Sequence, residues 1–224
     1  MKQKTIPQLI VMLTYNDFTV ENAEEIFEQC KHTDALYWGM KEKPLPLERL
    51  KALYARMKEC GKKTVLEVVG YSEEEGLRGA RLAAECGCDM LMGTTFSKTI
   101  SDYCVRHKVC YLPFVGEITG RPSIMRGDAD VMVRDALEAV KGGAAGIDLL
   151  AYRYVGNPAQ LIQRFVEEVE APLCVAGSID SYSRLDILRK LGPDYFTIGG
   201  AFFENKFGES FPEEIDSVIA YVTR

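Results

Sequence analysis

Two neighbouring segments, PLCVAGSID (172–180) and YFTIGGAFFEN (195–205), show the pattern that decides the fold. Each is a short apolar run that ends in glycine, and the amphipathic stretch 181–194 lies between them. Such a run is typical of a buried parallel strand, and the stretch between two of them is typical of a crossover helix. The pair therefore predicts a strand, helix, strand unit near the end of the chain.

The same unit recurs through the whole chain. Eight strands are predicted, each followed by a helical segment, at 9–15, 35–40, 64–69, 90–94, 109–115, 146–152, 173–177 and 195–199. Eight regular units in 224 residues favour one α/β domain over 1–224, a closed (β/α)8 TIM barrel. An open doubly wound sheet is the alternative, but no dinucleotide-type glycine fingerprint follows the first strand.

Composition excludes several classes of partner and location. The net charge is −6 and the basic residues form no stripe, which argues against a nucleic-acid-binding protein. No apolar run is long enough to span a membrane. Seven cysteines, an odd number, follow no secretory signal, so a cytoplasmic location is expected. Exposed aromatic residues make a homodimer a further expectation.

The two glycine turns predict an anion site. Glycine lets the backbone approach a ligand, and parallel strands of a barrel present their carboxyl ends at one mouth. Backbone amides there, with the first turn of a short helix, would hold a phosphate group. The candidates are Gly177, Ser178, Gly199, Gly200 and Ala201. The structural alternative is that these glycines only form tight strand exits.

With these motifs, VAGSI and TIGGA, the chain resembles the phosphate-binding barrels of the ribulose-phosphate-binding type. That group includes small sugar-phosphate aldolases, decarboxylases, epimerases and isomerases. The resemblance implies a small phosphorylated metabolite as ligand. It identifies no single activity, because the specific match is confined to these turns and one strand.

The third predicted strand, TVLEVVG (64–70), carries a candidate catalytic acid. Alternation places Glu67 on the face of Val65 and Val69, and a carboxylate avoids the apolar helix layer, so Glu67 should point into the barrel. The segment is similar to the glutamate-bearing strand of keto-deoxy-phosphogluconate aldolase, which implies a role in proton transfer. By the same alternation Asp148 should also point inward.

The sixth predicted strand lacks the Schiff-base lysine that those aldolases place there, so an imine from that position is not expected. Lys41, after the second strand, is the lysine at a strand end. Glu67 and Asp148 are expected as acid and base, with Lys41 as third catalytic residue. Alternatively, Glu67 and Lys41 form a structural ion pair. No cofactor is required, and two carboxylates are compatible with a divalent metal.

Further polar residues are predicted at the same mouth. Arg153 follows the sixth strand and could bind a carboxylate or phosphate. The glycine-rich segment 116–127 (GEITGRPSIMRG) is expected to be a lid loop, with Glu117 and Arg121 as ligand-binding candidates. Thr14, Asn16 and Asp17 follow the first strand. His32 and His107 are expected at the opposite end of the barrel.

Two functions are compatible with these patterns. The first is a lyase or isomerase that acts on a small phosphorylated sugar or keto acid by proton transfer. The second is a non-catalytic sensor of a phosphorylated metabolite, similar in outline to the glycerol-phosphate-responsive antiterminators. Replacing Glu67 distinguishes them, because an enzyme loses rate whereas a sensor loses only affinity.

Overall fold

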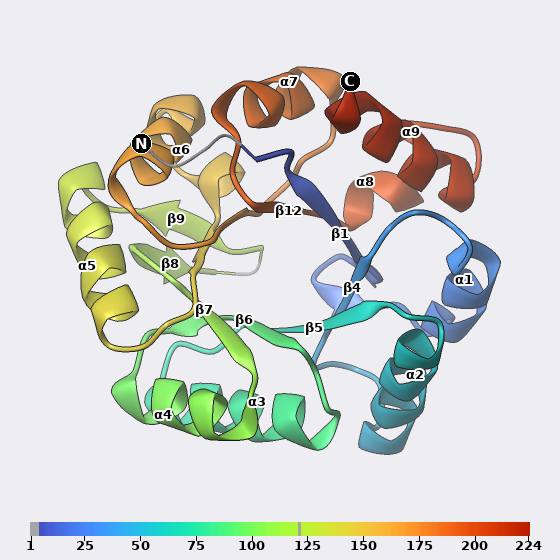
Figure 1. Cartoon of the computed structure of the whole chain (residues 1–224), viewed down its shortest axis with the longest axis horizontal. Helices are drawn as coiled ribbons and strands as arrows, with labels where there is room; N and C mark the ends of the chain where they lie inside the picture. Colours follow the sequence, from blue (N-terminus) through green and yellow to red (C-terminus); the bar gives the residue numbers. More distant parts are fainter. Residues whose placement is uncertain (1–4, 121) are drawn as a thin grey trace.

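A computed structural model describes residues 5–120 and 122–224. Its central feature is a closed barrel of parallel strands in the order β1-β12-β11-β10-β7-β6-β5-β4 (Figure 1). The prediction of a (β/α)8 barrel is confirmed, and each predicted strand overlaps an observed one. The barrel strands are β1 (Gln8–Met12), β4 (Tyr37–Lys41), β5 (Lys63–Val68), β6 (Met90–Thr95), β7 (Cys110–Phe114), β10 (Ile147–Leu149), β11 (Leu173–Val175) and β12 (Tyr195–Ile198).

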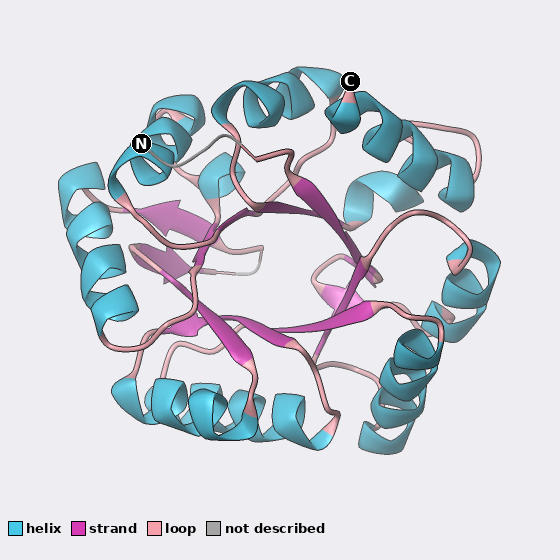
Figure 2. Ribbon diagram, viewed as in Figure 1, coloured by secondary structure: helices cyan, strands magenta, loops and turns pink. Residues whose placement is uncertain are grey.

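Helices form an outer ring around the barrel, as Figure 2 shows. Their apolar faces pack on the outward side chains of the strands, which form one continuous core with them. The ring consists of α1 (Ala23–Cys30), α2 (Leu47–Glu59), α3 (Glu73–Glu85), α4 (Lys98–His107), α5 (Ala129–Lys141), α6 (Pro158–Glu168), α7 (Tyr182–Leu191) and α9 (Phe211–Thr223). Two short turns of helix, η1 (Ala151–Arg153) and α8 (Gly200–Phe203), follow β10 and β12.

Local sequence signals fix where several helices start. Ser72 and Glu75 form a capping box at the start of α3, and the Asp128 carboxylate accepts hydrogen bonds from two amides of α5. Both caps satisfy amides that lack a partner inside the helix. The caps thereby set the first residues of α3 at Glu73 and of α5 at Ala129.

The lower interior of the barrel is filled by apolar side chains. They form a cluster separate from the outer core, made of Ile10, Met12, Val65, Met90, Met92, Leu112 and Cys174. Because inward residues alternate along each strand, the next inward residue of β5 after Val65 is Glu67. Apolar side chains therefore close the barrel toward the N-terminal ends of its strands, whereas the C-terminal ends of the strands carry polar side chains.

A tight hairpin, β2 (Thr14–Tyr15) and β3 (Phe18–Thr19), leaves the barrel after β1. Asn16 and Asp17 at its tip have φ values of 50° and 67°, the left-handed pair that a two-residue turn requires. Thr19 fixes the hairpin to β4. Its hydroxyl donates to the Lys41 carbonyl (2.8 Å) and accepts from the Lys41 amide (2.9 Å).

The segment expected to be a glycine-rich loop contains a second hairpin, β8 (Glu117–Thr119) and β9 (Ile124–Arg126). Its two short strands are antiparallel, and residues 117–119 pair with residues 124–126. The Tyr71 hydroxyl donates to the Gly120 carbonyl (3.3 Å), and the Tyr154 hydroxyl donates to the Gly127 carbonyl (3.0 Å). The hairpin is thus attached to two sides of the mouth.

Within the described ranges, every helix is too short or too polar to cross a lipid bilayer. All seven cysteines are free thiols, and most are buried. His32 follows α1 and His107 ends α4, both at the end of the barrel away from the mouth, as expected.

Candidate functional site

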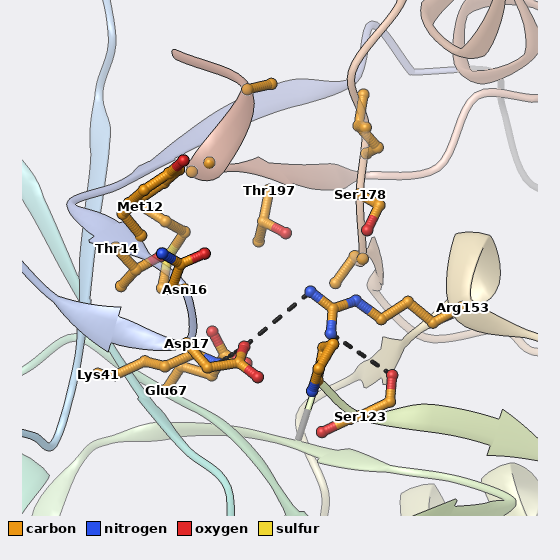
Figure 3. Close-up of a pocket in the computed structure, with 18 of the residues that line it drawn as sticks. Met12, Thr14, Asn16, Asp17, Lys41, Glu67, Ser123, Arg153, Ser178 and Thr197 are labelled. Atoms are coloured by element: carbon orange, nitrogen blue, oxygen red, sulfur yellow. Dashed lines mark hydrogen bonds and ion pairs between the residues drawn. The ribbon is translucent and has the colours of Figure 1, made fainter. Parts of the chain in front are cut away.

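A cavity of about 490 Å³ opens at the C-terminal ends of the strands, within the size range of small-molecule sites. It is lined by strand ends and by the turns that follow them, including residues of both hairpins (Figure 3). Its lining includes the polar and glycine residues Thr14, Asn16, Asp17, Lys41, Glu67, Ser123, Arg153, Gly177, Ser178, Thr197, Gly199 and Gly200, and also Ala201.

The two glycine turns form one wall of the cavity, as the sequence predicts. Gly177 has φ +89°, and a Cβ atom there would lie 2.8 Å from Cγ of Arg153, so both conformation and space require glycine. A Cβ on Gly199 would lie 2.7 Å from the Thr14 hydroxyl. Gly200 begins α8, whose first amides have no partner within the helix. These backbone groups can hold an anion.

Opposite the glycine turns lies a charged cluster made of Lys41, Asp17 and Glu67. Lys41 Nζ is 2.8 Å from Oδ1 of Asp17 and 3.5 Å from Oε1 of Glu67. The three side chains are nearly buried, with 8% of Lys41 and 14% of each carboxylate residue exposed. Glu67 points into the barrel, and the ion pair with Lys41 that the sequence suggested is present. Figure 3 shows the three side chains side by side.

Lys41 carries a positive charge in this setting. Burial alone would lower its pKa, but the Glu67 and Asp17 carboxylates outweigh burial and hold the pKa above its ordinary value. A nucleophilic lysine needs a neutral amine, which a raised pKa disfavours. Lys41 is therefore suited to stabilise negative charge rather than to form an imine.

Asp148 points inward from β10, as alternation predicts, but it does not line the cavity. It has no exposed surface, and its carboxyl oxygens make no hydrogen bond of good geometry with any described residue. Burial, followed by the nearby Glu67 carboxylate, raises the pKa of Asp148 well above its ordinary value, while Lys41 acts in the opposite sense. Burial therefore favours the neutral form of Asp148 next to the cluster, and its lack of exposed surface keeps it out of direct reach of a ligand in the cavity.

Arg153 crosses the cavity between the glycine turns and the charged cluster (Figure 3). Its Nη1 lies 3.5 Å from the Ser123 carbonyl, and its Nη2 lies 4.0 Å from Oδ1 of Asp17. Both distances are long for a guanidinium contact. The other ligand-binding candidates are divided: Asn16 lines the cavity, Glu117 is exposed on β8 and is not among the lining residues, and Arg121 lies outside the described residues.

Several site features were not anticipated from the sequence. Asp17 was expected at the mouth, but its contact with Lys41, 24 positions away, was not. Tyr-Asn-Asp-Phe (15–18) carries a two-residue hairpin signal that could have indicated how the chain turns there. Ser123 and Thr197 also line the cavity, and no pattern singled them out. In the ranges 5–120 and 122–224, no three acidic, His or Cys side chains are grouped to hold a metal ion.

No protein-family model matches the chain, and no curated protein sequence matches it significantly. Solved structures do match. Orotidine 5'-phosphate decarboxylase from Pyrococcus horikoshii OT3 aligns with a TM-score of 0.69 and 13% identity, over 97% of this chain and 100% of that one.

Two further matches correspond to the two functions weighed above. A 4-hydroxy-2-oxoglutarate aldolase/2-deydro-3-deoxyphosphogluconate aldolase from TTHB1 aligns with TM-score 0.67 and 15% identity, over 97% and 95% of the two chains. A glycerol uptake operon antiterminator regulatory protein from Listeria monocytogenes aligns with TM-score 0.59 and 16% identity, over 85% and 91%. At these identities the likeness establishes the fold: a small TIM barrel similar to enzymes of the ribulose-phosphate-binding type.

Proposed function

We propose that this protein is an enzyme that binds a small phosphorylated sugar or keto acid and catalyses a lyase or isomerase reaction by proton transfer. One observation carries the proposal: a single cavity has the glycine turns with their backbone groups on one side and the Glu67, Lys41 and Asp17 cluster on the other. A phosphate in the turns would anchor the ligand, so that its carbon skeleton extends toward Glu67.

Glu67 is the proposed base. Its carboxylate takes a proton from a carbon next to the carbonyl group of the ligand, and the electron pair moves onto the carbonyl oxygen to form an enolate. The Lys41 ammonium stabilises that negative charge, which its raised pKa supports. Where the deprotonated carbon bears a hydroxyl group, Glu67 returns the proton to the former carbonyl carbon and the hydroxyl proton moves to the former carbonyl oxygen, which gives isomerisation. In a lyase reaction, the protonated Glu67 instead protonates an enolate formed by cleavage of a carbon–carbon bond.

Asp148 receives a different role from that of Glu67. Because it is closed off from the cavity, it does not touch the ligand in this proposal, and it acts on Glu67 through its charge state. In its neutral form, Asp148 adds no second negative charge beside the Glu67 carboxylate.

A non-catalytic sensor is the second candidate. The structural match to an antiterminator regulatory protein favours it at the level of fold. In that case Glu67 and Lys41 would be a structural pair and a ligand would bind unchanged. The acidic composition offers no basic surface for RNA. A cytoplasmic location and a homodimer are part of the enzyme proposal, the former supported by the seven free thiols.

Glu67→Gln tests the choice between the two. We expect kcat on a converted sugar phosphate or phosphorylated keto acid to fall roughly 10²–10⁴-fold, the usual contribution of a general base, with phosphate affinity changed less than about twofold. Glu138→Gln, on the exposed side of α5, is the matched control and should change neither quantity. A panel of such esters that bind tightly but are never converted would support the sensor instead.

A further inference from the structure

The described lining of the cavity contains two positively charged side chains, Lys41 and Arg153. Lys41 is already neutralised, because two carboxylates lie within 3.5 Å of its ammonium group. A ligand anion would have to compete with both of them. Lys41 is therefore poorly placed to recognise an anionic group of the ligand in its ground state.

Arg153 is in a different position. A guanidinium has five N–H donors and forms its strongest contacts as paired bonds to one carboxylate or phosphate. Among the described residues, its guanidinium makes a 3.5 Å approach to the Ser123 carbonyl and a 4.0 Å approach to Asp17. Its side chain is 24% exposed, inside the cavity. A guanidinium with such long contacts has N–H donors available for a ligand.

The backbone and the stem of Arg153 are nevertheless held firmly. Its amide donates to the Leu150 carbonyl (2.9 Å) within η1, and two residues on, the Val155 amide donates to the Met125 carbonyl (3.1 Å) of the β8–β9 hairpin. The stem passes over Gly177, where a Cβ would lie 2.8 Å from Cγ of Arg153. Glycine at this position makes room for the arginine side chain. The guanidinium is thus presented at a defined place.

That place is separate from the glycine turns. The stem carbons contact Gly177, whereas the guanidinium nitrogens reach toward Ser123 and Asp17. Figure 3 shows the head of Arg153 between Ser178 and the charged cluster. An anion in the turns and an anion on the guanidinium would therefore be two groups of one ligand, joined by a short carbon chain.

We infer that the ligand carries a carboxylate in addition to its phosphate, and that Arg153 binds this carboxylate. The inference rests on the proposed function and narrows its substrate class from phosphorylated sugars or keto acids to phosphorylated carboxylic acids. The carboxylate on Arg153 would orient the adjacent carbon toward Glu67 and Lys41, which fits proton abstraction next to an acid or keto-acid group.

The test uses two phosphate esters of the same three-carbon length. 3-Phosphoglycerate ends in a carboxylate, where glycerol 3-phosphate has an alcohol. Calorimetric titration of the wild-type protein should show roughly 10- to 100-fold tighter binding of the acid, the range expected for a charge-assisted contact. Arg153→Gln should remove this preference and leave the affinity for inorganic phosphate within about twofold. Arg134→Gln, on the exposed surface of α5, is the control and should keep the preference.

Two results would overturn the inference. Equal affinity of the wild type for both esters would show that the site does not recognise the carboxylate. If Arg153→Gln lost affinity equally for both esters and for inorganic phosphate, the guanidinium would belong to the phosphate site. Arg153→Lys, which keeps the charge, guards against a folding defect and should retain part of the preference. A wild type that binds none of the three anions contradicts the anion cradle of the proposed function itself.

Discussion

The two sides of the cavity are built from different material. The β11 and β12 side offers backbone groups at Gly177, Gly199 and Gly200, and its geometry depends on glycine conformations. The β1, β4 and β5 side offers the charged side chains of Asp17, Lys41 and Glu67. The first side presents backbone groups, which do not titrate, although the Asp180 and Glu204 side chains also line it. The second side depends on which of its side chains are ionised.

In the proposed function, the glycine side binds the ligand and the charged side reacts with it. A backbone cradle keeps its partial charges at every pH and tolerates change in neighbouring side chains, but not added atoms at its glycines. A buried charge cluster is sensitive to the loss of any one member, because the remaining charges lose their compensation in a medium that solvates them poorly. Substitutions on the two sides should therefore change stability and ligand binding in different ways.

The largest expected effect on stability is that of Lys41→Met, which removes the one cation from the cluster. Asp17 and Glu67 then lose the ammonium group that both of them contact, so the free energy of unfolding at pH 7 should fall by about 3 kcal/mol. Urea denaturation measures it. The exposed pair Lys63–Asp89 is the control: Lys63→Met should cost under about 1 kcal/mol. Equal losses in the two variants would show that the cluster is not a coupled unit.

A second effect concerns pH. Asp148 in the unfolded chain loses its proton near its ordinary value of 3.8, whereas burial and Glu67 raise its pKa in the folded protein. Above the unfolded value the folded state keeps a proton that the unfolded state has released, so stability falls as the pH rises. Asp148→Asn removes this dependence. Between pH 4 and 5.5 the wild type should lose up to about 2 kcal/mol relative to the variant.

Urea denaturation at these two pH values measures the difference, and Asp135→Asn, a partly exposed residue of α5, is the control that should follow the wild type. If Asp148→Asn showed the same pH profile as the wild type, Asp148 would be ionised in the folded protein. The charge balance of the cluster would then differ from the one inferred here.

The smallest effect is expected in the backbone wall. Gly177→Ala forces a left-handed alanine and moves the Arg153 stem, which should cost about 1–2 kcal/mol and weaken the binding of inorganic phosphate. Gly61→Ala is a matched control: Gly61 has φ +73° with no atom within 4 Å of an added Cβ, so it imposes the strain without the contact. If both variants bound phosphate as the wild type does, the turn at Gly177 would not belong to the anion site.

The fold was predictable because its strands are short apolar runs, and the direction of Glu67 followed from alternation along β5. How deep each inward side chain lies in the barrel was not predictable. Asp148 alternates in the same way, but which inward residue reaches the cavity depends on strand stagger and on the neighbours that cover it. The contact between Asp17 and Lys41 depends on a hairpin and a strand that meet only in the folded chain.

The closure of the barrel has a consequence for synthesis. Strand β1 pairs with β4 on one edge and with β12 on the other, from Gln8 with Tyr195 to Val11 with Ile198. A ribosome completes β12 only after some 190 residues that follow β1, so the nascent chain carries an apolar strand with one open edge until then. The residues of the charged side are therefore made well before those of the glycine turns. The cavity can be complete only after β12 has paired with β1.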